Sequence, residues 1–221
     1  MEDWNQIGIN YLNEKKYEEA MRAFDRAIQD HPQDPLGYIN FGTVLTMIGE
    51  LERSLNFFEK AISLKANYPS AHYGYGGALY ELERYNEAIV EFKKAEQQGL
   101  NQADLHFMLG MSYVNVGQLM MALVHLQTAV ELNEDDVEAR FQYALCLAKL
   151  NHIDMALEQL NRIIEQKPNH PDAYYNMGVA FGMKGQSVEA KAAFEKALAL
   201  QEDHLLAING LKQLSKKEQG S

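Results

Sequence analysis

Apolar residues along this chain fall three and four positions apart, first over about thirteen residues and then over a further thirteen, and this double block recurs down the sequence. Spacings of three and four place apolar side chains on one face of an α-helix. Each double block therefore predicts two antiparallel helices, A and B, whose apolar faces pack together. We accordingly predict an all-α fold.

The double block recurs every 34 residues from residue 1 to residue 204, without an insertion or a deletion. Glycine or alanine usually occupies the eighth, twentieth and twenty-seventh positions, where a small side chain lets neighbouring helices approach closely. A large apolar residue occupies the twenty-fourth position: Phe24, Phe58, Phe92, Leu126, Leu160 and Phe194. The sequence therefore predicts six helix-turn-helix repeats, over residues 1–34, 35–68, 69–102, 103–136, 137–170 and 171–204.

Glycine and proline mark the turns of this pattern. The turn between helices A and B falls at the fifteenth position of each repeat. In four repeats this position holds a residue that suits a left-handed backbone: Gly49, Gly117, Asn151 and Gly185. Lys15 and Glu83 hold the position in the other two repeats, where we expect a cost of up to about 1 kcal/mol each. All five prolines lie at turns between repeats.

After residue 204 the pattern begins a seventh helix A without a partner helix B. Ile208, Leu211 and Leu214 continue the buried spacing, whereas Lys212 stands where a small residue would otherwise face a helix B. An open end of a repeat array needs a polar capping element. We predict a capping helix over residues 205–214 and a flexible tail over residues 215–221.

The period and its residues resemble a known family. Trp4, Gly8, Tyr11, Phe24 and Pro32 follow the pattern of the tetratricopeptide repeat (TPR). This resemblance implies a right-handed α-α superhelix, a TPR solenoid of thirteen helices whose A helices line a concave groove. Residues 34–41, 130–142 and 172–179 closely resemble one group of small all-TPR proteins of Gram-positive bacteria. That likeness implies a cytoplasmic, non-enzymatic, bacterial protein with a peptide-binding groove.

The family's groove positions are the second, fifth, sixth, ninth, twelfth and thirteenth of each repeat. Carried onto this chain, they are largely aromatic and aliphatic with amides at intervals, and contiguous exposed aromatics usually mark an interaction site. A tight superhelix that packs part of its own inner face is the alternative. The candidate peptide-binding residues are Asn5, Ile9, Ile39, Asn40, Thr43, Tyr73, Gly74, Gly77, Tyr80, Asp104, Phe107, Met108, Met111, Glu138, Phe141, Gln142, Leu145, Asp172, Tyr175 and Asn176.

Two glycines in this set, Gly74 and Gly77, have no packing role in the family pattern, unlike Gly76 at the eighth position. Between Tyr73 and Tyr80 they would leave a hollow where a partner backbone could lie close. Neutral sequence change, which an otherwise stable repeat array tolerates, explains the two glycines equally well.

The charge of the chain narrows the class of partner that it can bind. The formal net charge is −11, from 31 acidic and 20 basic residues, so nucleic acid is disfavoured. TPR domains that grip acidic chaperone tails use lysine and arginine in the groove, but Asn5 stands where the first such lysine would be, and Asp104, Glu138 and Asp172 are acidic. We expect a protein or peptide partner that is apolar with some basic residues.

Catalytic and metal-binding patterns are weak. The seven histidines are scattered over different faces without the i, i+4 spacing of a ligand pair, and Cys146 is the single cysteine. We predict no catalytic residue, no metal and no cofactor, and no segment is apolar for long enough to suggest a membrane span. The sequence favours a cytoplasmic, non-enzymatic scaffold that binds a peptide segment. The alternative is self-association through the groove or the uncapped first repeat, although a monomer is favoured.

Overall fold

The computed structural model describes residues 2–219, and over this range it contains thirteen α-helices and no strand. The all-α prediction is confirmed. The helices are α1 (Trp4–Asn13), α2 (Tyr17–Asp30), α3 (Pro35–Met47), α4 (Leu51–Leu64), α5 (Pro69–Glu81), α6 (Tyr85–Gln97), α7 (Ala103–Asn115), α8 (Leu119–Leu132), α9 (Val137–Lys149), α10 (Ile153–Gln166), α11 (Pro171–Met183), α12 (Ser187–Leu200) and α13 (Leu205–Gln219).

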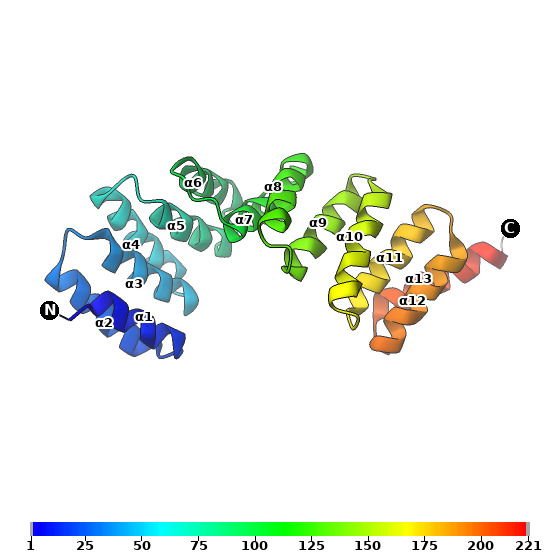
Figure 1. The fold of residues 1–221 in the computed structure, drawn as a ribbon, viewed down its shortest axis with the longest axis horizontal. Helices are drawn as coiled ribbons and strands as arrows, with labels where there is room; N and C mark the ends of the chain where they lie inside the picture. The colour runs from blue at the N-terminus through cyan, green and yellow to red at the C-terminus, as the bar shows by residue number, and fades with distance from the viewer. Residues whose placement is uncertain (1, 220–221) are drawn as a thin grey trace. The chain divides into compact units, whose positions relative to one another are not determined.

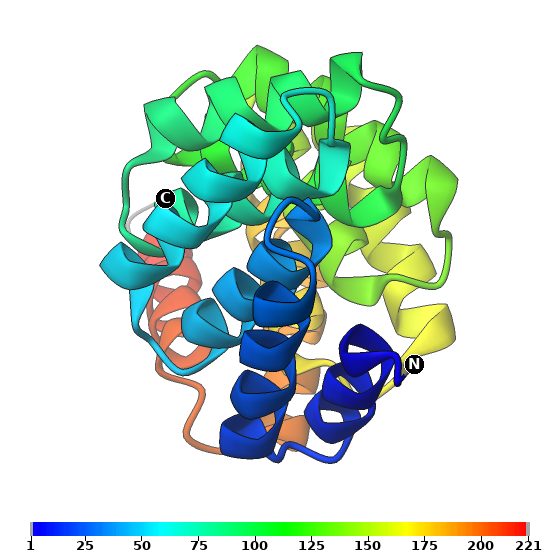
Figure 2. The same cartoon turned by 90° about the vertical axis from the view of Figure 1, so that its left-hand side faces the viewer.

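The helices pack in consecutive pairs within two compact units, one ending at Val116 and one beginning at Gly117 (Figure 1). In the first unit α1 packs on α2, α3 on α4 and α5 on α6, and the second helix of each pair also contacts the first helix of the next pair. Figure 2 shows the dark-blue α1 and α2 beside the lighter blue α3. In the second unit α9 packs on α10 and α11 on α12, with α8 against α9 and α13 against α12.

The core repeats one contact between a large ring and a small residue. Phe92, at the twenty-fourth position, is fully buried, and Gly76, at the eighth position of the same repeat, lies against its ring. A Cβ atom on Gly76 would lie 2.7 Å from that ring, closer than real Cβ contacts come. The same relation joins Gly178 to Phe194 in the second unit. Glycine at this position therefore makes room for phenylalanine.

The predicted turns have the predicted backbone. Gly49, Gly117, Asn151 and Gly185 have φ angles between 63° and 81°, which is the left-handed region. Lys15 and Glu83 adopt the same region at 58° and 59°, although each carries a Cβ atom. The fifteenth position of each repeat thus forces one backbone conformation whatever residue is present.

We expect Lys15→Gly to raise the free energy of unfolding, and Gly49→Lys, at the same position of the next repeat, to lower it. Each change should amount to about 0.5–1 kcal/mol, because only glycine adopts a left-handed φ without steric cost. Thermal and denaturant melts of the two variants measure this pair of effects. Two shifts of the same sign would contradict the turn geometry.

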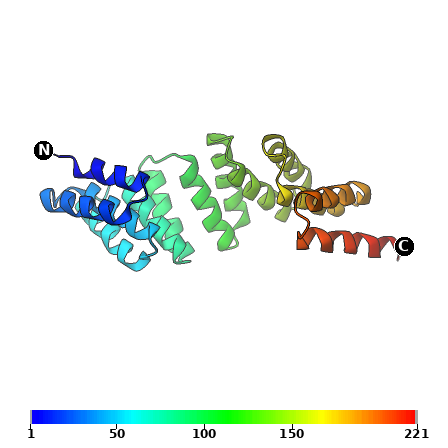
Figure 3. The ribbon, with the colours of Figure 1, turned by 90° about the horizontal axis from the view of Figure 1, so that it is seen from below.

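The last helix differs from its prediction in two respects. It ends at Gln219 and not at residue 214, so residues 215–219 of the predicted flexible tail are helical, and residues 220–221 lie outside the described range. Its solvent side is also less polar than expected, because Leu205 is 72% and Leu206 54% exposed. Ala207 is fully buried, Leu211 and Leu214 pack beside the core, and Lys212 meets solvent as predicted. Figure 3 shows the red α13 alongside the orange α12.

Candidate functional site

The candidate residues all lie on one face of the first helix of each pair, which we call the helix-A face. It is formed by positions 2, 5, 6, 9, 12 and 13 of each repeat, and their spacing places them together on a helix. In the first unit this face belongs to α1, α3, α5 and α7, and in the second unit to α9 and α11.

In the first unit most apolar candidates are half-buried. Tyr73, Tyr80, Phe107, Met108 and Met111 all retain part of their surface. The Tyr73 ring also lies 5.8 Å from the ring of Phe92, so it contributes to packing between α5 and α6. Burial, and then the nearby charge of Asp104, raises the pKa of Tyr73 and keeps its hydroxyl protonated. The face therefore offers apolar surface with uncharged hydroxyl groups.

Two expectations for the first unit are wrong. Ile39 is only 5% exposed because it points into the core, so it adds almost nothing to a binding surface. Gly74 does have a packing role: an added Cβ atom would overlap the ring of Phe58, the large residue of the preceding repeat. An added Cβ atom on Gly77 would meet nothing within 4 Å, so this glycine has no packing role, as expected.

Polar candidates of the first unit tie successive helices together. The Asn40 side-chain amide on α3 donates to Asn5 Oδ1 on α1 at 3.0 Å, and Asn115 on α7 donates to the Tyr80 hydroxyl on α5 at 3.3 Å. The Thr43 hydroxyl donates to the Ile39 carbonyl. Ile9 is half-buried beside the core, and Asp104 is exposed.

In the second unit two aromatic candidates are partly buried by contacts with the core. The Phe141 ring on α9 lies 5.2 Å from His170, and Phe141 packs against the core formed by α9–α12. Tyr175 on α11 lies 5.8 Å from Phe194 and 5.2 Å from His204. Side chains at the fifth position therefore contact the core and also keep some exposed surface. The sequence pattern did not distinguish these two roles.

The remaining candidates of the second unit are half-buried or exposed. Gln142, Leu145 and Asn176 are half-buried, and Glu138 and Asp172 are exposed. Asp172 Oδ1 lies 3.2 Å from His204 Nε2, and Gln142 donates to Glu138 at 2.8 Å. These contacts hold two carboxylates at the surface of the helix-A face.

A hollow of about 430 Å³ opens between α11 and α13. Its walls combine helix-A positions of α11 with the same positions of α13, which the sequence prediction treated only as a cap. The 34-residue register could have found them, because Leu206, Asn209 and Gln213 are the second, fifth and ninth positions of a seventh repeat. The lining residues are Tyr175, Gly178, Val179, Gly182, Met183, Phe194, Leu206, Asn209, Gly210, Gln213 and Leu214.

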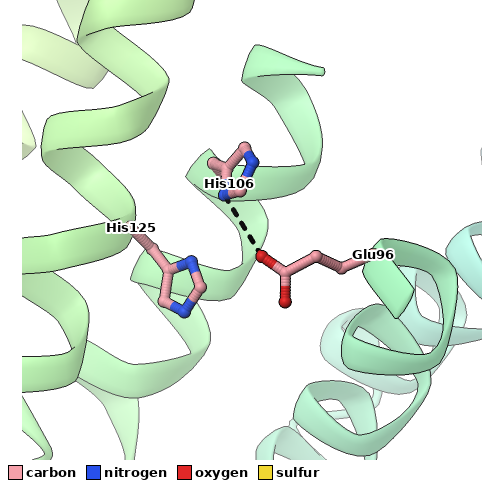
Figure 4. Close-up of side chains that lie close together, drawn as sticks. All are labelled: Glu96, His106 and His125. Carbon is pink, nitrogen blue, oxygen red and sulfur yellow. Dashed lines mark ion pairs between the residues drawn. The ribbon is translucent and has the colours of Figure 1, made fainter. Parts of the chain in front are cut away.

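The buried histidines of the first unit hold the fold together. His72 Nδ1 lies 2.7 Å from Glu91, its Nε2 lies 3.0 Å from the Ala66 carbonyl, and Glu91 also pairs with Lys94. Figure 4 shows the Glu96 carboxylate facing His106, whose Nδ1 lies 3.8 Å away. The other ring nitrogen of His106 lies 2.8 Å from Asn101 Oδ1. Both histidine rings are thus engaged at both nitrogens inside this unit.

The single cysteine is not placed as a nucleophile. Cys146 is 1% exposed, and its Sγ atom donates to the Leu119 carbonyl at 3.4 Å. Burial raises the pKa of this thiol, which lowers the fraction of reactive thiolate at neutral pH. Cys146 is a core residue of the second unit.

Two of the five basic residues at the twenty-sixth position lie over an aromatic ring of their own repeat. The Arg26 guanidinium lies 4.8 Å from the Trp4 ring and Lys196 Nζ lies 5.9 Å from the Tyr174 ring. Both rings stand at the fourth position of their repeats, which is not a position of the helix-A face. These contacts engage two basic side chains within their own repeats.

Comparison with known proteins decides the family. Four segments, residues 1–34, 48–101, 117–179 and 171–204, match models of the tetratricopeptide repeat. The crystal structure of YrrB, described as a TPR protein with an unusual peptide-binding site, is 43% identical. The match covers 86% of this chain and 98% of YrrB, with a TM-score of 0.82. The chain belongs to the tetratricopeptide repeat family.

Other solved structures share the fold at lower identity. MamA is 25% identical, over 73% of this chain and 94% of MamA, with a TM-score of 0.69. PilF of Pseudomonas aeruginosa is 17% identical, over 95% of this chain and 96% of PilF, with a TM-score of 0.82, and shows the fold alone. No match to a curated protein sequence was found. TPR proteins are generally non-enzymatic scaffolds for other proteins. Within the described range no helix of this TPR protein is long and apolar enough to cross a membrane.

Proposed function

We propose that this TPR protein is a non-enzymatic, cytoplasmic scaffold that binds a peptide segment of a partner protein on its helix-A face. The observation that carries the proposal is the row of incompletely buried apolar side chains at corresponding positions of successive A helices. Tyr73, Phe107 and Met111 in the first unit, and Leu145 and Tyr175 in the second, all keep surface open to a ligand. The 43% identity to YrrB, which is described as having a peptide-binding site, supports the same assignment.

The charges of the helix-A face favour a partner with basic residues. Asp104, Glu138 and Asp172 occupy the second position of three repeats and all are exposed. Asn5, which accepts a hydrogen bond from the Asn40 amide, stands where an acidic chaperone tail would need a lysine. An acidic peptide would therefore bring carboxylates towards carboxylates, whereas lysine or arginine side chains would find partners. We infer an apolar segment flanked by basic residues.

Reversing these charges should change affinity with a definite sign. Asp104→Lys and Glu138→Lys should each weaken binding of a Leu-containing, Lys-flanked peptide about threefold to tenfold, and strengthen binding of its Glu-flanked counterpart. Fluorescence anisotropy at two salt concentrations measures both peptides, and the difference should shrink in high salt because exposed charges are screened.

Glu52→Lys on α4 is the matched control, since Glu52 is exposed, lies on a helix B and changes the net charge by the same amount. It should leave both affinities within about twofold. Equal effects of Glu52→Lys and Asp104→Lys would show that overall charge, and not the helix-A face, governs binding.

Self-association is the second candidate function. It is favoured by exposed apolar residues on α8, where Met120 is 62%, Val124 57% and Met121 42% exposed. Light scattering over a hundredfold range of protein concentration separates the two candidates. Peptide binding by a monomer predicts a constant molecular mass, whereas a mass that rises with concentration and falls in Met120→Asp would establish self-association.

A further inference from the structure

The hollow between α11 and α13 has an uncharged lining. None of its eleven lining residues is charged, although charged residues form 23% of the chain. Val179, Met183 and Leu206 border it and all are exposed, Met183 to 55%. Exposed apolar side chains gathered around a concavity mark a binding site more often than a solvated surface.

Glycines shape the floor of this hollow. Gly178 and Gly210 are accounted for by the Phe194 ring, which an added Cβ atom would approach to 2.6 and 2.7 Å. Gly182 has no such reason, because a Cβ atom there would meet nothing within 4 Å. Glycine inside a helix makes that helix less stable than alanine would, so packing does not explain why residue 182 lacks a side chain. What the bare position does provide is depth in the hollow.

The size of the hollow limits what it can hold. A dry cavity of about 150 Å³ is enough for a benzene ring. The volume of about 430 Å³ therefore has room for one or two bulky side chains, but not for a folded element. Asn209 and Gln213 are exposed on the α13 side, where their amides can donate to and accept from the backbone of an extended peptide.

We propose that the hollow between α11 and α13 is an anchor pocket for an uncharged, bulky apolar side chain of the bound peptide, of the leucine, methionine or phenylalanine type. The inference rests on the proposed function and specifies the site of its main apolar contact in the second unit. It also gives α13 a second role. The helix covers the end of the core and at the same time forms one wall of the pocket.

A defined peptide panel tests the pocket. Fluorescein-labelled peptides of ten residues, with two lysines on each side and leucine, phenylalanine, methionine, serine or aspartate at the centre, are titrated with the full chain. The three apolar peptides should bind at least about tenfold more tightly than the serine and aspartate peptides. Equal binding of the leucine and serine peptides would overturn the proposal, as would binding by none of the panel.

Two variants locate the contact. Leu206→Asp places a charge in the wall, and Gly182→Leu fills the hollow from α11, where the space is free. Each variant should bind the leucine peptide about tenfold or more weakly than the native protein does. The melting temperature of Gly182→Leu should be no lower than that of the native protein, because the new side chain enters empty space. Leu205→Asp is the matched control, since Leu205 is more exposed than its neighbour and does not line the hollow. It should keep the affinity within about twofold.

The variants also separate this inference from the proposed function. If the leucine peptide binds and is weakened by Asp104→Lys or Gly77→Leu but not by Leu206→Asp or Gly182→Leu, the helix-A face binds peptide and the anchor pocket is wrong. If Leu206→Asp and Leu205→Asp weaken binding equally, the effect is one of general charge and the pocket is also wrong. If no peptide binds, both proposals fail.

Discussion

Gly76→Ala is expected to lower the free energy of unfolding by about 2–3 kcal/mol, whereas Gly77→Ala, one residue further along the same helix, should raise it by about 0.5–1 kcal/mol. The difference arises from their surroundings. A Cβ atom on Gly76 would lie 2.7 Å from the fully buried ring of Phe92, which has no room to move, and a Cβ atom on Gly77 would meet nothing within 4 Å.

A compensating change should rescue the first variant. In the fifth repeat Ala144 stands at the eighth position and the smaller Leu160 at the twenty-fourth, and both lie in one buried cluster. Phe92→Leu alone should therefore leave a cavity that lowers stability by about 1–2 kcal/mol, while Gly76→Ala with Phe92→Leu should be more stable than the sum of the single effects by about 2 kcal/mol. Denaturant melts of the four proteins measure this coupling, and simple additivity would contradict the contact.

Phe107→Ala should weaken peptide binding by about 2 kcal/mol, which is about thirtyfold. Phe107 is half-buried on the helix-A face of α7, and aromatic side chains with partly buried surface dominate binding energies because they bury large areas at small rotamer cost. Fluorescence anisotropy with the leucine peptide measures the loss, and melting of the same variant corrects for any unfolded fraction. Since the ring is half-buried, some loss of stability will accompany the loss of binding.

Phe57→Ala is the control for this effect. Phe57 is also half-buried, and its ring is stacked on Phe41 with centroids 4.5 Å apart, but it lies on the helix-B partner of its repeat. This variant should melt at a lower temperature and yet bind the peptide as well per folded molecule. If Phe107→Ala also melts at a lower temperature but binds the peptide as well per folded molecule, Phe107 is a packing residue and the helix-A face is assigned incorrectly.

The helices and turns could be predicted from the sequence because their causes are local. The left-handed turn at Lys15 follows from a fixed place in a 34-residue register, whatever residue stands there, and the φ of 58° agrees. The burial of Phe24 and Phe58 follows from apolar spacing in the same way. Such features need no knowledge of which side chains meet across the repeats.

Contacts between helices were harder to predict. Gly74 packs against Phe58 of the preceding repeat, and Phe141 packs beside His170, so both positions serve the core more than the family pattern implied. The hydrogen-bonded pair of His72 and Glu91 joins residues nineteen apart and has no signature within one helix. The hollow between α11 and α13 depends on α13, which has no partner helix B. The repeat pattern predicts this helix only as a cap and not as one side of a binding site.

The most direct test of peptide binding on the helix-A face is a methyl NMR titration of the full chain with ¹³C-labelled methionine. Met108, Met111 and Met183 lie on the helix-A face, whereas Met120 and Met155 are exposed on helices B. Addition of the leucine peptide should shift the first three methyl signals and leave the last two unchanged. Shifts confined to Met120 and Met155, or no shift at saturating peptide, would contradict binding at this face.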